Sequence, residues 1–312
     1  MQILLDVVLP VFLVIGFGYV AALRGIFSES AADGLMRFAQ NFALPCMLFA
    51  GIARVDLGDA FHAPILVSFY TGALASAVVA VLGARFVFKR SGVEAVVVGM
   101  VAVFGNSALL GLSITERAYG SDALQWNYAI LSIHAPVFYG LGICAMEIVR
   151  SSGQGIARGA LTRQIGRGIV TNPLVIGIVL GWIVNISGLA LPQTLWSAIE
   201  MMVRAAIPAA LFGLGAVLLR YKPEGDLRLI GYALMCSMLI HPAVAYLLGT
   251  QLFHLGTGPL RSLTISAAMA PGVNTYIFAN MYGASRRVAA SAVLLGTVAS
   301  ILTVWGWLSI LP

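Results

Sequence analysis

Long apolar stretches separated by short polar connections dominate the hydrophobic pattern of the chain. A helix needs about 20 mostly apolar residues to cross a bilayer. The pattern therefore predicts an all-α integral membrane protein of ten transmembrane helices, with short connections between most of them. The predicted spans are residues 4–23, 35–53, 63–88, 95–118, 124–149, 168–186, 195–219, 227–253, 260–282 and 288–311. The first lacks a basic leader and is long enough to span, so we interpret it as a helix and not as a signal peptide.

Composition agrees with this interpretation. The chain is 60% hydrophobic and 10% charged, whereas a soluble domain carries about 25% charged residues. Its surface must therefore contact a lipid bilayer. The formal net charge of +6 comes from residues between apolar stretches, which predicts membrane orientation and no nucleic-acid partner. The three cysteines lack CxxC spacing, so no metal site or cofactor is predicted.

The basic residues alternate between the two sides of the predicted membrane. Only Arg54, Arg117, Arg204 and Arg261 fall in even-numbered connections, and the other 14 of the 18 fall in odd-numbered ones. Cytoplasmic loops carry the excess of Lys and Arg. The distribution predicts that the odd connections are cytoplasmic and that both termini lie outside the cytoplasm.

An internal repeat relates the two halves of the chain. ALPCMLFAGIA, from Ala43, matches AIPAALFGLGA, from Ala206, at an offset of 163, and AYG at 118–120 matches MYG at 281–283 at the same offset. We therefore divide the chain into a five-helix repeat at 1–150, a cytoplasmic linker at 151–167 and a second repeat at 168–312. Because five is odd, the second copy enters the membrane from the opposite face, as in the inverted repeats of secondary transporters.

Glycine, proline and small polar residues interrupt the fourth and ninth predicted spans near their centres, in FGNSALLGLS and AMAPGVNTYIFAN. A broken helix leaves backbone polar groups that lipid cannot satisfy, and the half-helix that follows presents free N–H groups suited to an anion. Matching breaks in two halves point to a transporter's binding site, although Gly and Pro also serve close helix packing. The predicted substrate-binding residues are Gly105, Asn106, Ser107, Pro271, Gly272, Asn274 and Thr275.

Two histidines lie within predicted spans. His134 and His241 each stand near the middle of an apolar stretch and close to a proline. An intramembrane imidazole can carry a coupling proton, and it can equally be a neutral ring that bonds to a backbone carbonyl. Two further ionic contacts are expected from helical spacing, Glu200 with Arg204 and Asp33 with Arg37.

Four segments together resemble the auxin efflux carrier family, and the chain looks like a bacterial member related to the plant PIN-type carriers. They are NFALPCMLFAGIA, FGNSALLGLSI, TNPLVIGIVLGW and APGVNTYIFANMYG, and the resemblance covers essentially the whole chain. It implies two inverted five-helix repeats whose broken fourth and ninth helices cross at mid-membrane to form the substrate site. It also implies a scaffold of helices one, two, six and seven, a mobile unit of the other six, and a homodimer.

The resemblance further implies a multi-pass protein of the bacterial inner (plasma) membrane that carries a small organic anion, a mono- or dicarboxylate such as malonate or an auxin-like acid. One position departs from the family pattern. The fourth span reads Gly111-Leu112-Ser113 where the family usually has Gly-Leu-Pro, which leaves the position of its break open.

Two other functions are weighed against an organic anion carrier. A sodium-coupled organic anion symporter of the bile-acid type would need carboxylates beside the breaks, and the sequence places none there. An enzyme is not predicted, because the sequence lacks HExxH, GxSxG and paired intramembrane aspartates. No catalytic residue is therefore assigned.

Overall fold

The computed structural model describes residues 2, 4–54, 62–150 and 171–312. Every named element in these ranges is helical. Seven helical stretches are long and apolar enough to cross a membrane. They are Leu4–Leu23, Glu29–Arg54, Ala63–Val87, Ser121–Arg150, Gln193–Leu218, Leu227–Leu252 and Arg286–Ile310. The predicted linker at 151–167 and the connection after Arg54 lie outside the described residues.

Within these stretches, α-helices are joined end to end with short π-helical segments. The label η is used for these π-helical segments and also for the short 3₁₀ helix η5. Their bounds are η1 (Leu4–Val8), α1 (Leu9–Leu23), α2 (Glu29–Phe38), η2 (Ala39–Ala43), α3 (Leu44–Arg54), α5 (Ala63–Leu82), η3 (Gly83–Val87), η5 (Ser121–Ala123), α8 (Leu124–Arg150), α11 (Gln193–Leu218), α12 (Leu227–Met235), η6 (Cys236–Ile240), α13 (His241–Leu247), η7 (Leu248–Leu252) and α16 (Arg286–Ile310).

The remaining three predicted spans coincide with shorter helices. The fourth is divided into α6 (Gly92–Val103), η4 (Ser107–Gly111) and α7 (Leu112–Tyr119), and the ninth into α14 (Thr257–Ala267) and α15 (Val273–Tyr282). The sixth is represented by α10 (Pro173–Ser187), which begins at a proline after the N-cap residue Asn172. The predicted interruptions of the fourth and ninth stretches are therefore present in the structure.

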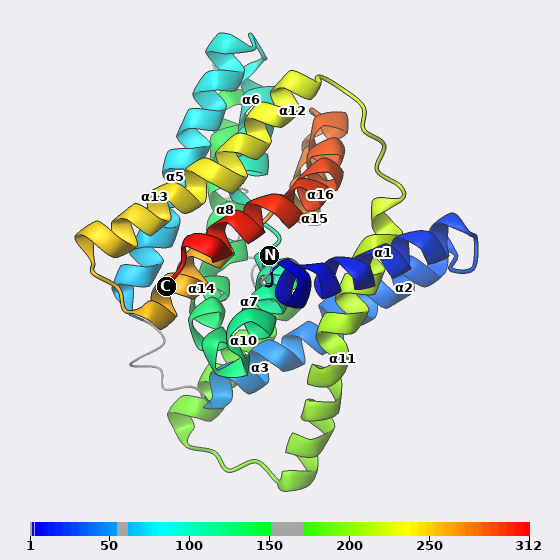
Figure 1. Ribbon diagram of the computed structural model, residues 1–312, viewed down its shortest axis with the longest axis vertical. Helices are drawn as coiled ribbons and strands as arrows, with labels where there is room; N and C mark the ends of the chain where they lie inside the picture. The colour runs from blue at the N-terminus through cyan, green and yellow to red at the C-terminus, as the bar shows by residue number, and fades with distance from the viewer. Residues whose placement is uncertain (1, 3, 55–61, 151–170) are drawn as a thin grey trace.

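The helices pack around two hydrophobic cores. The first core contains buried residues of α1, α2, α3, α10 and α11. Buried residues of other helices, among them η4, α7, α8 and α16, also belong to it. Among the described residues, the second core takes none from those five helices and is built from α5, α6, α8 and α12 to α16. We call α1, α2, α3, α10 and α11 the first unit and the remaining helices the second unit (Figure 1).

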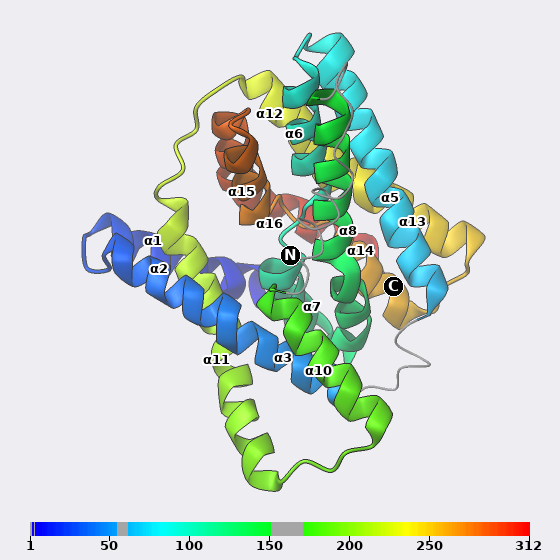
Figure 2. The ribbon, with the colours of Figure 1, turned by 180° about the vertical axis from the view of Figure 1, so that it is seen from behind.

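Two matching helix contacts hold the first unit together. A Cβ added to Gly18 of α1 would lie 1.9 Å from the carbonyl oxygen of Phe212 in α11, and one added to Gly181 of α10 would lie 2.9 Å from that of Phe49 in α3. Both residues of the second contact are offset by 163 from their counterparts in the first. Glycine lets two helix backbones approach closely, and Figure 2 shows α3 and α10 side by side.

The two halves also end corresponding helices at a glycine with positive φ. Gly120 after α7 and Gly283 after α15, again 163 apart, both have positive φ, of 85° and 69°. Glycine reaches this region at little cost. The α5 helix ends in the π-helical η3 and the α13 helix in η7, and residues with positive φ, Lys89 and His254, follow them.

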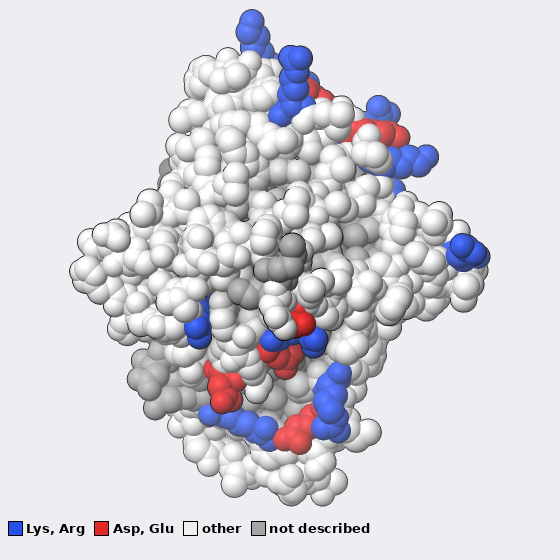
Figure 3. All heavy atoms as spheres, in the orientation of Figure 1, with Lys and Arg blue, Asp and Glu red and all other residues white. Residues whose placement is uncertain are grey.

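Ion pairs join elements that are distant in sequence. Glu200 pairs with Arg54 at 2.7 Å, and Asp33 pairs with Arg220 at 2.7 Å. The expectation that Glu200 pairs with Arg204 and Asp33 with Arg37 was therefore wrong. The packing of α11 against α2 and α3 places Arg54 beside Glu200 and Arg220 beside Asp33 instead. Figure 3 shows most of the charged side chains on this face gathered toward two ends of the molecule, with a largely uncharged surface between them.

Candidate functional site

The two helix breaks lie against each other. Residues 104–106 separate α6 from η4, and residues 268–272 separate α14 from α15. Gly105 and Pro271 form an antiparallel bridge. The amide of Asn106 donates to the carbonyl of Ala270 at 2.7 Å, and the amide of Gly272 donates to the carbonyl of Phe104 at 2.8 Å. Each break thus satisfies polar backbone atoms of the other.

Glycine and proline explain why the chain unwinds at these positions. Proline cannot donate a backbone hydrogen bond, so Pro271 ends the regular ladder of α14. A Cβ at Gly272 would lie 3.3 Å from the Cα of Asn106, and one at Gly105 would lie 3.3 Å from the carbonyl oxygen of Met269. Any larger residue would push the two backbones apart, so the glycines permit the crosswise hydrogen bonds.

Several carbonyls at or just before the breaks accept hydrogen bonds within the protein. Besides the two crosswise bonds, the Ser107 hydroxyl donates to the carbonyl of Ser266 at 2.9 Å, and the amide of Ala268 donates to the carbonyl of Thr264 at 2.9 Å. The N-termini of the two segments that follow the breaks are different, because no side chain caps the backbone amides at the start of η4 or α15. The crossing therefore presents the positive ends of two uncapped helical segments, while several carbonyls of the segments that precede the breaks accept hydrogen bonds.

A cavity of about 250 Å³ opens beside this crossing, between the two units. Among the described residues that line it, the polar side chains are five amides and one imidazole, and none is Asp, Glu, Lys or Arg. The lining consists of Gln40, Asn41, Leu44, Leu48, Phe104, Gly105, Asn106, Ala108, Leu109, Leu131, His134, Ala135, Asn172, Pro173, Leu174, Val175, Gly272, Val273 and Asn274.

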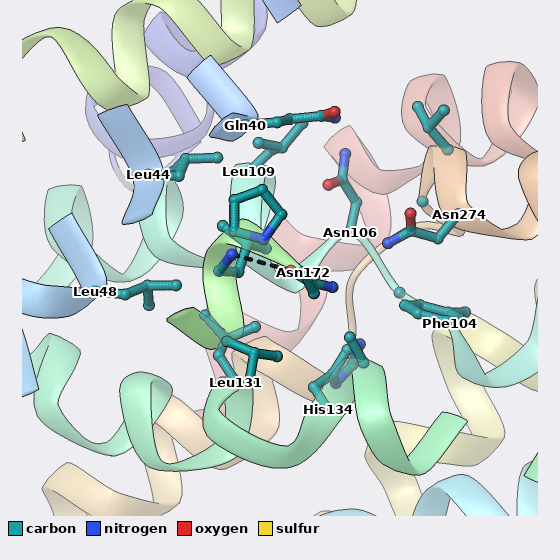
Figure 4. Close-up of a pocket in the computed structure, with 18 of the residues that line it drawn as sticks. Gln40, Leu44, Leu48, Phe104, Asn106, Leu109, Leu131, His134, Asn172 and Asn274 are labelled. Carbon is teal, nitrogen blue, oxygen red and sulfur yellow. Dashed lines mark hydrogen bonds between the residues drawn. The ribbon is translucent and has the colours of Figure 1, made fainter. Parts of the chain in front are cut away.

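Three helix N-termini reach this cavity. The segments that begin at Ser107 and Val273 come from the breaks, and the third is α10, whose first residues Pro173 and Leu174 line the wall. The side-chain oxygen of Asn172 accepts from the Leu174 amide at 2.9 Å (dashed in Figure 4). Helix N-termini carry partial positive charge, and the two that begin at the breaks are uncapped, whereas Asn172 caps α10. Their convergence suits an anion.

Two polar side chains in the cavity wall have unpartnered atoms. The side-chain nitrogen of Asn106 and both ring nitrogens of His134 are buried without a hydrogen-bond partner. The rings of Phe104 and Phe138 pack edge-on against the imidazole, at centroid distances of 5.3 and 4.6 Å. Unpaired buried polar atoms are costly, so a ligand that accepts from Asn106 and His134 would remove that cost (Figure 4).

The structure separates the predicted site residues into two groups. Gly105, Asn106, Gly272, Asn274 and His134 line the cavity. The others lie behind its wall. Thr275 is fully buried and donates to the Gly272 carbonyl at 2.8 Å, and Ser107 and Pro271 hold the crossing together as described.

His241 does not reach the cavity. It is buried, and its Nε2 lies 3.2 Å from the carbonyl oxygen of Phe69, whose ring stands between the elements that carry the two histidines. The two histidines of the sequence analysis are thus in different surroundings, since only His134 faces the cavity.

Three polar residues of the cavity were missed from the sequence. Gln40 and Asn41 lie in η2 and Asn172 precedes α10, all in the first unit. Amides inside apolar stretches were the available signal, and Asn41 and Asn172 both stand within segments that carry the family resemblance. The hydroxyl of Tyr139 donates to the side-chain oxygen of Asn274 at 3.3 Å, which fixes the orientation of that amide.

Ser113 does not move the break in the fourth stretch. Its hydroxyl donates to the carbonyl of Leu109 one turn earlier, within the continuous helix that η4 and α7 form. The unwound residues are 104–106, upstream of the position where the family usually has proline. The location left open by the sequence is therefore set by the Gly105 backbone and its contact with the other break.

Comparison with known proteins adds independent information. Residues 3–308 match the family model described as "Membrane transport protein". A "Putative malonate transporter" of Rhizobium meliloti is 25% identical over 302 residues, covering 96% of this chain and 93% of the relative. The "Uncharacterized transporter YfdV" of Escherichia coli is 24% identical, covering 96% and 95%. "Auxin efflux carrier component 5" of Arabidopsis thaliana is 24% identical, covering 94% and 92%.

Proposed function

The chain belongs to the membrane transport protein family, which includes the auxin efflux carriers, and on this premise we propose that it is a secondary carrier of a small organic anion. It is a membrane transporter and not an enzyme. The proposed substrate is a mono- or dicarboxylate, such as malonate or an auxin-like acid. The relative described as a malonate transporter supports the dicarboxylate class.

The observation that carries the proposal is the cavity beside the crossed breaks. Its three helix N-termini and the unpartnered Asn106 and His134 side chains favour a negatively charged guest over a cation. The carbonyls of Phe104 and Ala270 already accept hydrogen bonds across the crossing, which makes them poor ligands for sodium. A cavity of about 250 Å³ is below the roughly 300–1,000 Å³ of drug-sized sites, which suits a solute of malonate size.

We propose that ten spans in two inverted five-helix repeats build this site. The matching contacts of Gly18 with Phe212 and Gly181 with Phe49 support the repeat, as do the glycine ends of α7 and α15. The first unit would act as scaffold and the second unit, which has its own core, would move across it. Because the cavity lies between the two units, such a motion would expose the anion to either side in turn.

The charge distribution supports the proposed orientation in the inner membrane. Arg85, Lys89 and Arg90 follow α5, and Arg286 and Arg287 begin α16, both in connections expected to be cytoplasmic. With both termini outside the cytoplasm, the α15 half-helix runs from the crossing toward the cytoplasm.

We propose His134 as the residue that can couple transport to a proton. It alone of the two histidines borders the proposed anion cavity, and its buried ring nitrogens have no partner within hydrogen-bond geometry. A neutral cavity that binds a monoanion moves net charge across the membrane, whereas a protonated His134 would balance it. His241, bonded to the Phe69 carbonyl, would position the rings beside His134.

The test is a ligand screen followed by flux. Purified protein would be heated with malonate, with other small carboxylates and with cationic analogues of equal size, because selective binding raises the unfolding temperature. The carboxylates that stabilise the protein should then be transported in proteoliposomes, and Asn274→Ala should reduce both effects. If the cationic analogues stabilise the protein and no carboxylate does, the anion assignment is wrong.

A further inference from the structure

A second cavity, unrelated to the crossing, lies where the loop after α11 passes the start of α16. Its volume is about 450 Å³. Four of its lining residues are cationic and one is acidic, and two tyrosines complete the polar wall. The lining residues are Val217, Arg220, Tyr221, Lys222, Glu224, Tyr276, Arg286, Arg287 and Ala290.

Two of the four cations are neutralised and two are not. Arg220 pairs with Asp33 at 2.7 Å, and Arg287 pairs with Glu224 at 3.5 Å. Within the described ranges, neither Lys222 nor Arg286 has a carboxylate within salt-bridge distance. Of the segments whose structure is not described, 151–170 contain no Asp or Glu, and 55–61 contain Asp56 and Asp59. Among the described residues, the cavity therefore keeps two cations without a carboxylate partner.

The loop that carries Lys222 is fastened to α16. Ser291 of α16 accepts from the amide of Glu224 at 2.9 Å, and its hydroxyl faces the carbonyls of Glu224 and Lys222 at 2.7 and 3.0 Å. Gly225 then turns the chain with a φ of 108°. The Ser291 hydroxyl thus anchors the backbone of Lys222 and Glu224, which lowers the entropic cost of ordering this loop when an anion binds.

The cavity also has the features of a site at a membrane surface. It lies at the ends of the apolar helices α11 and α16, and its floor contains Val217 and Ala290. The rings of Tyr221 and Tyr276 are in contact, with centroids 5.2 Å apart. Tyrosine is enriched at membrane–water interfaces, and basic pockets between spanning helices bind lipid head groups.

We propose that this cavity binds the phosphate of an anionic phospholipid, with Lys222 and Arg286 as its principal contacts. The bound head group would bridge the loop from α11, in the first unit, to α15 and α16, in the second. It would therefore stabilise the arrangement of the two units seen here. The site is separate from the carboxylate cavity, so the inference stands or falls independently of the transported substrate.

The experiment compares lipid binding in a double variant and a matched control. Lys222→Gln with Arg286→Gln removes the unpaired charges from the cavity. Lys89→Gln with Arg228→Gln removes one lysine and one arginine, both exposed and basic, from outside it. Native mass spectrometry of the purified protein with phosphatidylglycerol or phosphatidylcholine measures retained lipid. Unfolding temperatures in vesicles of each lipid give a second readout.

The wild type and the control should retain phosphatidylglycerol and be stabilised by it. The cavity variant should bind it about 25-fold more weakly, because each surface cation contributes about fivefold. The variant with the two residues exchanged, Lys222→Arg with Arg286→Lys, keeps both charges and should bind phosphatidylglycerol like the wild type. Equal retention by the cavity variant and the wild type would overturn the proposal. So would stabilisation of the wild type by inorganic phosphate in phosphatidylcholine vesicles to the same extent, because the ligand would then be a soluble anion.

Discussion

Replacing Asn106 by alanine should weaken anion binding without weakening the fold. Its side-chain nitrogen is buried and has no partner in the structure, so the unliganded protein loses no hydrogen bond on truncation. The side chain borders an existing cavity, so its removal enlarges that space and creates no new enclosed void. The stability of the unliganded protein should change by less than about 1 kcal/mol, since the unpaired nitrogen already costs desolvation.

The effect on binding should be much larger. A hydrogen bond to a charged group contributes about 1.5–3 kcal/mol, which corresponds to about 10- to 150-fold in the dissociation constant. Anion-induced stabilisation and initial uptake rates in proteoliposomes would measure it, with malonate and an aryl acetate as the first probes.

Asn127 provides the matched control, because it is a second buried asparagine with a different environment. Its side-chain nitrogen donates to the hydroxyls of Thr115 and Ser266 at 3.2 and 2.9 Å, and it does not line the cavity. Asn127→Ala should lower the free energy of unfolding by about 1–3 kcal/mol and leave the affinity of the folded fraction unchanged. Our reasoning would be refuted if Asn106→Ala bound the anion like the wild type, or if the two variants exchanged these behaviours.

Three further predictions test the helix contacts, the proton coupling and the surface charges. Gly18→Ala places a Cβ 1.9 Å from a backbone oxygen and should cost about 1–3 kcal/mol or more of unfolding free energy. Gly16→Ala, which meets no atom within 4 Å, should cost nothing measurable in the same denaturation assay. His134→Gln should abolish the pH dependence of flux in proteoliposomes while His241→Gln preserves it, and equal profiles in both would exclude His134 as the proton carrier. A hydrogen bond from the Leu229 amide and, to a smaller extent, one from the Arg90 guanidinium lower the pKa of Asp226 below its ordinary value. Asp226 therefore stabilises the fold above the unfolded-state pKa of about 4, and this contribution is lost as the pH falls through the lower folded pKa. Asp226→Asn should flatten that part of a stability–pH curve, and an unchanged acid limb would contradict the assignment.

The sequence was sufficient for features that depend on local backbone chemistry. Proline at 271 and glycine at 105 and 272 forbid or loosen a regular helix, so both interruptions could be predicted, while the exact position of the one in the fourth span stayed open. The apolar lengths likewise identified the seven long helices. Neither inference requires knowledge of which helix lies beside which.

The features that depend on distant contacts were not accessible in the same way. Asp33 and Glu200 stand near arginines at helical spacing, but packing brings Arg220 and Arg54 to them. Gln40 and Asn172 are 132 positions apart in the sequence and still face one cavity with Asn106. Periodicity within a span cannot show which polar residue points at another span.

The anion site follows from the proposed inversion of the two repeats. If the repeats entered the membrane from the same side, the half-helices that follow the two breaks would run in the same direction. With opposite entry, α7 and α15 both lead away from the crossing, so their N-termini face one central point. The halves that precede the breaks also meet there with their negative ends, where the amides of Asn106 and Gly272 and the Ser107 hydroxyl donate to the carbonyls of Ala270, Phe104 and Ser266. Together with the two uncapped N-termini, this arrangement would give an anion a positive field without a charged side chain among the described residues that line the cavity. Such a field could move with the second unit without the cost of carrying a lysine or arginine through the bilayer.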